Sequence, residues 1–242
     1  FAKGKQATLI FDGAMSHARV YVNGKEAGYW PYGYNSFHLD VTPYLKAGEV
    51  NELAVRLENE NESSRWYPGA GLYRNVHLVV TEDAYVPTWG TKVTTPMVKD
   101  KFAKVHLETQ WNMPKGKKIS DYTIATQILN PEGKQVNADT RPGNELDETL
   151  FAQDFVVRNP KLWSVEYPHL YTAVSKIYEG DRLVDEYTTR FGIRTLEIIP
   201  EKGFFLNGKM TKFKGVCNHH DLGPLGAAVN DAAIRRQIRI MK

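Results

Sequence analysis

The sequence has almost no cysteine, since Cys217 is the only one among its 242 residues. A lone thiol excludes a disulfide within the chain and any metal site built from a cluster of cysteines, but it does not fix the redox compartment. A free cysteine usually behaves as a small buried apolar residue, so we expect Cys217 to be buried and inert. The fold must therefore draw its stability from apolar packing, for which a hydrophobic content of 42% is ample.

Long apolar runs and an excess of one charge are also missing. No stretch approaches the roughly 18 apolar residues of a membrane-spanning helix, so we expect no membrane partner. The 31 basic and 28 acidic residues are scattered and leave a net charge of +3, which gives no broad footprint for nucleic acid. Four cations gather in residues 235–242, where an amphipathic helix with a solvated basic face explains them better than a nucleic-acid contact does.

The two ends of the sequence lack the marks of a complete protein. Residues 1–5 have neither an initiating Met nor the apolar core of a signal peptide,. Residues 240–242 lie inside a helical pattern that has no cap. We therefore expect a fragment of a longer protein.

What the sequence does have is β patterning over most of its length. In the first 82 residues the strand-like runs are bounded by turn residues, and Asn23-Gly24 is typical of a two-residue hairpin turn. This pattern predicts a β-sandwich, and residues 82–87, which are polar and end in Pro, are predicted to be a linker. The expected strands are 8–11, 18–22, 25–30, 37–41, 53–57 and 76–80.

A second β region follows the predicted linker. About seven short strands over roughly 110 residues, separated by turns such as Asn130-Pro131-Glu132-Gly133, favour an immunoglobulin-like sandwich. The region shows no cluster of titratable residues, so we expect its role to be structural. A second Asn-Gly hairpin, at Asn207-Gly208, comes after it.

Near the end of the chain a polar loop separates a strand pattern from a helix pattern. The apolar residues Phe213 and Val216 predict a strand, and Asn230 predicts the cap of a helix. A strand, a loop and a helix form one βα unit, and in α/β folds sites are built on the loops that follow the strands. The candidate site residues are Asn218, His219, His220 and Asp221. The alternative is a pair of loop histidines bonded only to backbone groups.

An aromatic loop over residues 65–76 is the second candidate for binding. Aromatic ring faces flanked by Arg suit stacking on the C–H face of a sugar and hydrogen bonding to its hydroxyls. Arg65 and Trp66 are the candidate residues, and the alternative is that Trp66 plugs one end of the sandwich. The acidic run just before this loop, residues 58–62, is predicted to be a solvated loop and not a cation site.

Three passages of the sequence resemble glycoside hydrolase family 2, and the β-galactosidase branch most of all. The passages are 30–37 with 65–76, then 160–171, then 191–194 followed by 205–209 and 214–221. The resemblance implies a mainly β fold in three parts. These are a jelly-roll sugar-binding domain lacking its first strands (1–82), an immunoglobulin-like sandwich (83–199) and the incomplete start of a catalytic TIM (β/α)₈ barrel (200–242).

The resemblance implies a retaining hydrolase of terminal β-galactosides. Two glutamates would carry the reaction, with their carboxyl groups about 5–5.5 Å apart, and both are expected after residue 242. We therefore expect no catalytic residue in this chain and no activity from it alone. His219 matches a family histidine that contacts the sugar in the reactive subsite. Asn218, His220 and Asp221 are expected to orient it or to shape the loop, and Arg65 falls where some members carry a sugar-binding aspartate.

Several properties stay open after the resemblance. No metal ligand of the family is matched, and the resemblance implies no cofactor for this chain. A requirement of the full-length enzyme for Mg²⁺ stays open. So do its assembly into a homo-oligomer and its location, periplasmic or cytoplasmic, in a bacterium. A β-glucuronidase or β-mannosidase has the same domains and is the alternative within the family. A free-standing carbohydrate-binding β-sandwich protein is the alternative outside it, although the terminal βα pattern argues against it.

Overall fold

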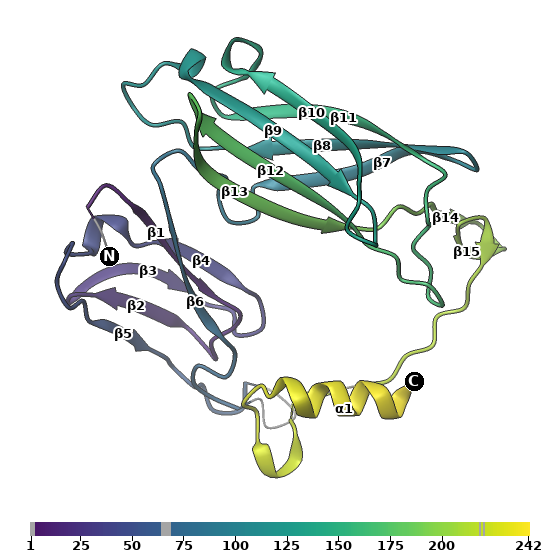
Figure 1. The fold of residues 1–242 in the computed structure, drawn as a ribbon. Helices are drawn as coiled ribbons and strands as arrows, with labels where there is room; N and C mark the ends of the chain where they lie inside the picture. The colour runs from purple at the N-terminus through teal and green to yellow at the C-terminus, as the bar shows by residue number, and fades with distance from the viewer. Residues whose placement is uncertain (1–2, 64–68, 218, 220) are drawn as a thin grey trace. The chain divides into compact units, whose positions relative to one another are not determined.

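The computed structural model describes residues 3–63, 69–217, 219 and 221–242. They form two compact units. The first is Phe1–Thr81 together with Val216–Lys242, and the second is Glu82–Gly215. Every strand pair is antiparallel, so the prediction of a mainly β fold is confirmed (Figure 1). No helix in the described ranges has the length and apolar character to cross a membrane.

The first unit contains a small β-sandwich of two three-stranded sheets. One sheet has the order β4-β1-β6 and the other β3-β2-β5. The strands are β1 (Gln6–Phe11), β2 (Ala18–Val22), β3 (Lys25–Trp30), β4 (Phe37–Asp40), β5 (Leu53–Arg56) and β6 (Val76–Thr81), with a 3₁₀ turn η1 (Thr42–Tyr44). The predicted Asn23-Gly24 hairpin turn is confirmed, since both residues have the positive φ that such a turn requires,.

The core of the first sandwich is aromatic at its centre. Every second residue of β1 and β2 is buried, as strict alternation predicts for strands with one face covered,. Phe37 stacks on Phe11 with the ring centroids 4.7 Å apart and on Trp30 at 5.6 Å. Phe11 and Phe37 belong to one sheet and Trp30 to the other, so the stack of Phe37 on Trp30 joins the two sheets.

Residues 82–87 are not the linker that their polarity predicted. Ala84 and Val86 are buried in the core of the second unit, and Tyr85 bridges to Asn112. The carboxylate of Asp185 accepts a hydrogen bond of 2.8 Å from the Val86 amide. The alternating apolar residues of this segment therefore pack as an extra edge of the second sandwich.

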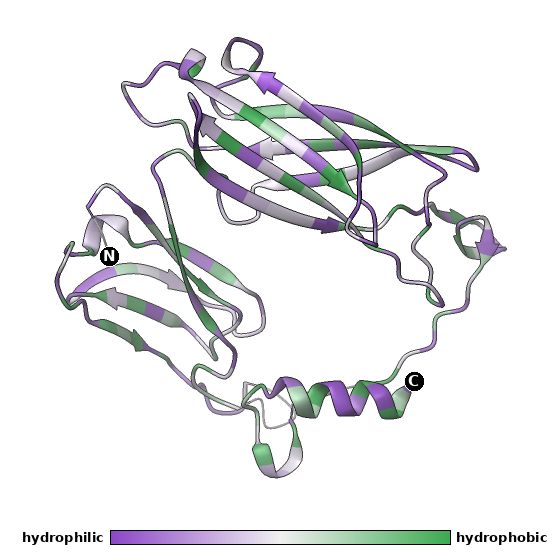
Figure 2. Cartoon of the chain, viewed as in Figure 1, coloured by the Kyte–Doolittle hydropathy of each residue, from purple (hydrophilic) through white to green (hydrophobic). Residues whose placement is uncertain are grey.

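The second unit has the seven predicted strands of an immunoglobulin-like sandwich. A four-stranded sheet, β10-β9-β12-β13, faces a three-stranded sheet, β11-β8-β7. The strands are β7 (Thr91–Lys99), β8 (Phe102–Gln110), β9 (Tyr122–Leu129), β10 (Gln135–Pro142), β11 (Leu150–Arg158), β12 (Tyr171–Glu179) and β13 (Arg182–Phe191), with turns η2 (Ile119–Asp121) and η3 (Gly143–Glu145). Figure 2 shows hydrophobic and hydrophilic residues alternating along them.

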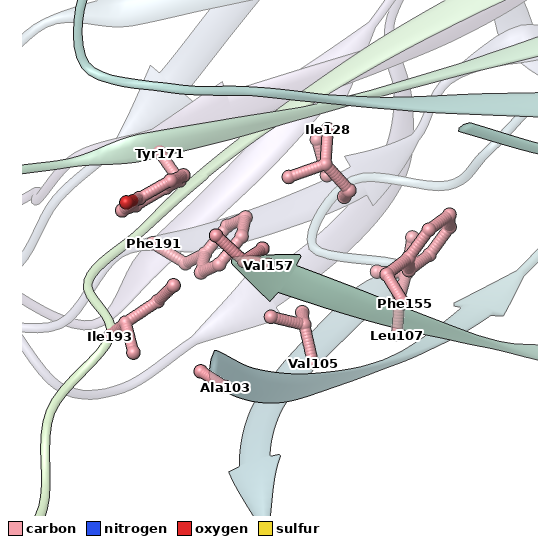
Figure 3. Packing of buried hydrophobic residues seen from close by; sticks show 10 residues of the cluster. Ala103, Val105, Leu107, Ile128, Phe155, Val157, Tyr171, Phe191 and Ile193 are labelled. Carbon is pink, nitrogen blue, oxygen red and sulfur yellow. The ribbon is translucent and has the colours of Figure 1, made fainter. Parts of the chain in front are cut away.

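The interior of this sandwich contains two apolar clusters. The first includes Val105, Ile128, Phe155 and Phe191, and Figure 3 shows these side chains converging from both sheets. The second surrounds Trp111, whose ring meets Tyr122 edge-on at 5.4 Å and whose indole N–H donates to the Asp147 carbonyl. With no disulfide among the described residues, packing of this kind carries the stability.

The last part of the chain is a small sheet, an extended segment and a helix. The sheet β14-β15-β16 contains the predicted Asn207-Gly208 turn, and residues 211–217 form no strand. The predicted strand around Phe213 and Val216 is therefore wrong, because nothing in the described chain pairs with this segment. For the same reason Cys217 is exposed and not buried. The elements are β14 (Leu196–Ile199), β15 (Gly203–Leu206), β16 (Lys209–Met210), η4 (Gly223–Leu225) and α1 (Asp231–Met241).

Gly143 tests how tightly the second unit is packed. A Cβ atom at Gly143 would lie 1.8 Å from the Ile119 carbonyl oxygen. The atoms nearest to this Cβ are backbone atoms of Ile119 and Ser120, which cannot rotate away as a side chain could. Gly143→Ala is therefore expected to lower the free energy of unfolding, measured by urea denaturation, by about 1–3 kcal/mol or more. Gly215→Ala is the matched control, since its Cβ would meet nothing within 4 Å. Equal stability of the two variants would contradict the packing.

Candidate functional site

The loop before α1 is held by hydrogen bonds among its own residues. The Asp221 carboxylate accepts a hydrogen bond of 2.8 Å from the Gly223 amide. The amides of Leu222 and Gly226 close the turn around η4 with bonds of 2.9 Å. The predicted N-cap is confirmed, because the Asn230 side chain accepts from the Ala233 amide at 3.1 Å. Asp221 therefore shapes this loop, and the cap fixes where the helix begins.

The aromatic loop that enters β6 is anchored from residue 71 onward. Gly71 and Met15 exchange two backbone hydrogen bonds of 3.0 and 3.1 Å. The buried phenol of Tyr73 donates to the Gly33 carbonyl at 2.8 Å, and the Arg74 guanidinium donates to two backbone carbonyls. Burial raises the pKa of Tyr73 above its usual value, partly opposed by the Arg74 cation over its ring. The phenol is thus a permanent donor at neutral pH.

One backbone hydrogen bond joins these two loops. The amide of Val229, just before the cap of α1, donates to the Tyr73 carbonyl at 2.9 Å. Residues that are more than 150 positions apart in the sequence therefore meet inside the first unit. Because Tyr73 is itself fixed to Gly33, the end of the polar loop is tied to the sandwich.

An exposed polar and aromatic cluster lies on the rim of the same unit. One ring nitrogen of His17, Nδ1, lies 2.7 Å from the Tyr29 hydroxyl, and the other, Nε2, lies 3.3 Å from a Glu60 carboxylate oxygen. The Arg19 guanidinium lies 4.7 Å from the centre of the Tyr29 ring and is paired with Glu26. Such a mixture of donors, acceptors and aromatic edge is the chemistry that sugar hydroxyls require.

The predicted site residues are only partly described. His219 is exposed, and Asp221 is exposed and bonded to its own loop. Asn218, His220, Arg65 and Trp66 lie outside the described residues. Of the predicted set, the described residues are therefore His219 and Asp221.

Sequence reasoning missed the cluster around His17. The residues His17, Tyr29 and Glu60 come from three separate stretches, and each is unremarkable in its own context. The only local signal was the alternation of β2 and β3, which places Arg19 and Tyr29 on the outward face as directly opposed partners,. His17 lies in a bend directly before β2 and has a positive φ of 48°.

The second unit also carries charged groups that the sequence did not reveal as clusters. On the outer face of the β11-β8-β7 sheet, His106 lies 2.8 Å from Asp154 and 3.6 Å from Glu108. Elsewhere, hydrogen bonds from Lys117 and Arg182 hold the pKa of Glu179 below its usual value. Neither group gathers the ligands of a metal, and no such set occurs within residues 3–63, 69–217, 219 and 221–242.

A pocket of about 690 Å³ lies beside the β14-β15-β16 sheet. Its wall is mostly apolar, with the Arg194 guanidinium 5.0 Å from the centre of the Trp163 ring. None of the described site residues predicted from the sequence lines it. The lining residues are Trp163, Val165, Glu166, Arg194, Leu196, Phe204, Leu206, Thr211, Lys212, Phe213 and Lys214.

Comparison with known families identifies the class of protein that this arrangement represents. Residues 1–82 match the sugar binding domain of glycosyl hydrolases family 2, and residues 85–194 match a second domain of glycosyl hydrolases family 2. Both matches follow the order of the two sandwiches. The chain therefore belongs to glycoside hydrolase family 2, as its resemblance to that family indicated.

Individual relatives agree with this assignment. A β-galactosidase of Bacteroides ovatus is 45% identical over 99% of this chain, which spans 28% of that enzyme. A β-glucuronidase of Bacteroides fragilis is 28% identical over 99% of the chain and 36% of its own length. The crystal structure of a family 2 member from Bacteroides cellulosilyticus matches with a TM-score of 0.88 and 36% identity, over 98% of this chain and 31% of that one. The chain thus spans about a third or less of these relatives.

Tyr73→Phe tests the anchoring of the aromatic loop. The variant keeps the ring but leaves the buried Gly33 carbonyl without its donor, so we expect a loss of about 1–2 kcal/mol in the free energy of unfolding. Urea denaturation of the 242-residue chain is the measurement. Tyr32→Phe is the control, because Tyr32 is 53% exposed and should change stability little. A Tyr73→Phe variant as stable as this control would show that the bond does not anchor the loop.

Proposed function

We propose that this chain is the non-catalytic front portion of a retaining β-glycosidase that hydrolyses terminal β-galactosides. The observation that carries the proposal is the 45% identity to the Bacteroides ovatus β-galactosidase over almost the whole chain. Because the chain spans 28% of that enzyme, the catalytic carboxylates are assigned to the region outside these 242 residues.

The proposed chemistry needs two carboxyl groups about 5–5.5 Å apart, one acting as acid and then base and the other as nucleophile. The proposed contribution of this chain is to bind and orient the sugar. The match of residues 1–82 to a sugar binding domain supports this role. The bond between Val229 and Tyr73 supports it too, because it holds the loop that carries His219 close to that domain.

His219 is the proposed sugar contact within the loop. Its imidazole can donate one hydrogen bond and accept another, which suits a pair of sugar hydroxyls. Asp221 then acts through the loop by fixing its turn, and it is a positioning residue.

A β-glucuronidase is the second candidate, favoured by the relatives of that name in Bacteroides fragilis and Formosa agariphila. The two sugars differ by a carboxylate in place of a hydroxymethyl group, so a glucuronidase must supply a cation to the substrate. We assign the residues that discriminate between the two sugars to the part of the enzyme outside these 242 residues. The higher identity to the β-galactosidase, 45% against 28%, favours the galactoside.

The activity is tested by assaying the full-length parent with chromogenic β-galactoside, β-glucuronide and β-mannoside, with the 242-residue chain assayed alongside. We expect the parent to hydrolyse the galactoside and the shorter chain to hydrolyse none of the three. Turnover by the shorter chain would place catalytic carboxylates within it and overturn the proposal. Turnover of the glucuronide alone would support the second candidate.

His219→Ala in the full-length parent tests the proposed contact. Loss of one or two hydrogen bonds to the substrate is expected to lower kcat/KM by about 10- to 100-fold. His77→Ala is the matched control, because His77 is an exposed histidine of the first unit whose ring nitrogen Nε2 lies 3.2 Å from the Asp12 carboxylate. An unchanged kcat/KM in His219→Ala would exclude the contact.

A further inference from the structure

A row of polar side chains crosses the interior of the second sandwich. In the described part of the chain, four buried side chains are polar, and each is at most 2% exposed. They come one each from β8, β9, β11 and β12, and we call them the polar belt. The belt consists of Thr109, Thr126, Gln153 and Ser175.

The belt lies at the boundary between the two apolar clusters. Each belt residue has two inward-facing neighbours, two positions before it and two positions after it. One of these neighbours belongs to the first apolar cluster and the other to the second. The flanking pairs are Leu107 on β8 and Trp111 directly after it, Ile124 and Ile128 on β9, Phe151 and Phe155 on β11, and Ala173 and Ile177 on β12. Figure 3 shows Leu107, Ile128 and Phe155 among the side chains of the first cluster.

The half of the belt on the larger sheet is satisfied by direct hydrogen bonds. Ser175 and Thr126 are opposite one another in the ladder, as are Thr126 and Asp139. The two hydroxyl oxygens, of Thr126 and Ser175, are 3.0 Å apart. The Gln153 amide reaches this row from the other sheet and donates to the Asp139 carboxylate at 3.1 Å.

The other half of the belt has two orphaned atoms. Among the described residues, Thr109 Oγ1 and Gln153 Oε1 are buried side-chain atoms without a hydrogen-bond partner. The orientation of the Gln153 amide is fixed, because a flip would turn its oxygen toward the Asp139 carboxylate. Oε1 therefore needs a donor, while the Thr109 hydroxyl needs an acceptor. Buried polar atoms without partners are rare because their loss of water is uncompensated.

The register makes the two residues that carry these atoms neighbours on adjacent strands. Phe151 lies opposite Thr109 and Gln153 lies opposite Leu107, so Thr109 and Gln153 are diagonal neighbours on the inner face of adjacent strands. Diagonal neighbours are roughly 7–8 Å apart at their Cα atoms, a spacing at which two side chains can share one small bridging molecule. A group that accepts from one atom and donates to the other would satisfy both.

We propose that the polar belt is a binding site for one internal water molecule, held between Thr109 Oγ1 and Gln153 Oε1. Water accepts the threonine hydroxyl and donates to the amide oxygen, and the Thr126–Ser175 pair on the facing sheet offers further partners for its remaining bonds. A metal cation does not fit, because the orphaned pair offers one acceptor and one donor. An anion fails for the same reason, and the Asp139 carboxylate beside it is already paired with Arg141.

A high-resolution crystal structure of the 242-residue chain tests the proposal directly. The expected result is a single ordered water within about 3.2 Å of both Thr109 Oγ1 and Gln153 Oε1. A direct hydrogen bond between the two side chains would overturn the proposal. So would clear density for both side chains with nothing between them.

Thr109→Val gives a second test, in which the direction of the change in stability distinguishes a hydrated site from a dry one. If water occupies the site, removing the hydroxyl leaves the water short of a partner, and the unfolding equilibrium constant of the second unit should rise about tenfold. If the site is dry, removing an unpaired hydroxyl should lower that constant. Hydrogen exchange of the β8 and β11 amides reads the second unit alone. Thr123→Val, on the outward face of β9, is the control for the preference of valine for strands.

Discussion

The architecture depends on burying alternate side chains between paired antiparallel sheets. The chain offers no disulfide and no cluster of metal ligands in its described part, so each sandwich relies on the apolar faces of its own strands. In the first unit the stacked rings of Phe11, Phe37 and Trp30 fill the gap between the sheets. In the second unit two clusters do so.

Most of the fold could be predicted from the sequence, because alternation and turn chemistry are local. The hairpins at Asn23-Gly24 and Asn207-Gly208 need only two residues with positive φ, and the cap at Asn230 needs only a side chain and a nearby amide. The strand at Phe213 could not be predicted correctly from local pattern, because a strand forms only where another strand pairs with it. Residues 82–87 show the opposite error. Their polar residues predicted a linker, but the segment packs through two buried side chains, Ala84 and Val86.

Much less of the candidate site was visible in the sequence. The polar loop around His219 was found because its polar residues are consecutive. The aromatic loop was found because its aromatic residues are close together in the sequence. The link between them, from Val229 to Tyr73, is a bond between backbone groups and leaves no mark on residue choice. The cluster of His17, Tyr29 and Glu60 depends on the pairing of strands and turns, which residue identity alone does not specify.

The belt of polar residues also bears on how the second sandwich finds its strand register. A slip of one residue turns every apolar side chain outward and is strongly penalised. A slip of two residues keeps the same face inward, so alternation alone does not oppose it. Moving β9 by two positions would separate Thr126 from Ser175 and push a hydroxyl into an apolar cluster. The belt therefore disfavours registers shifted by two residues, which the alternation of apolar and polar residues alone would allow.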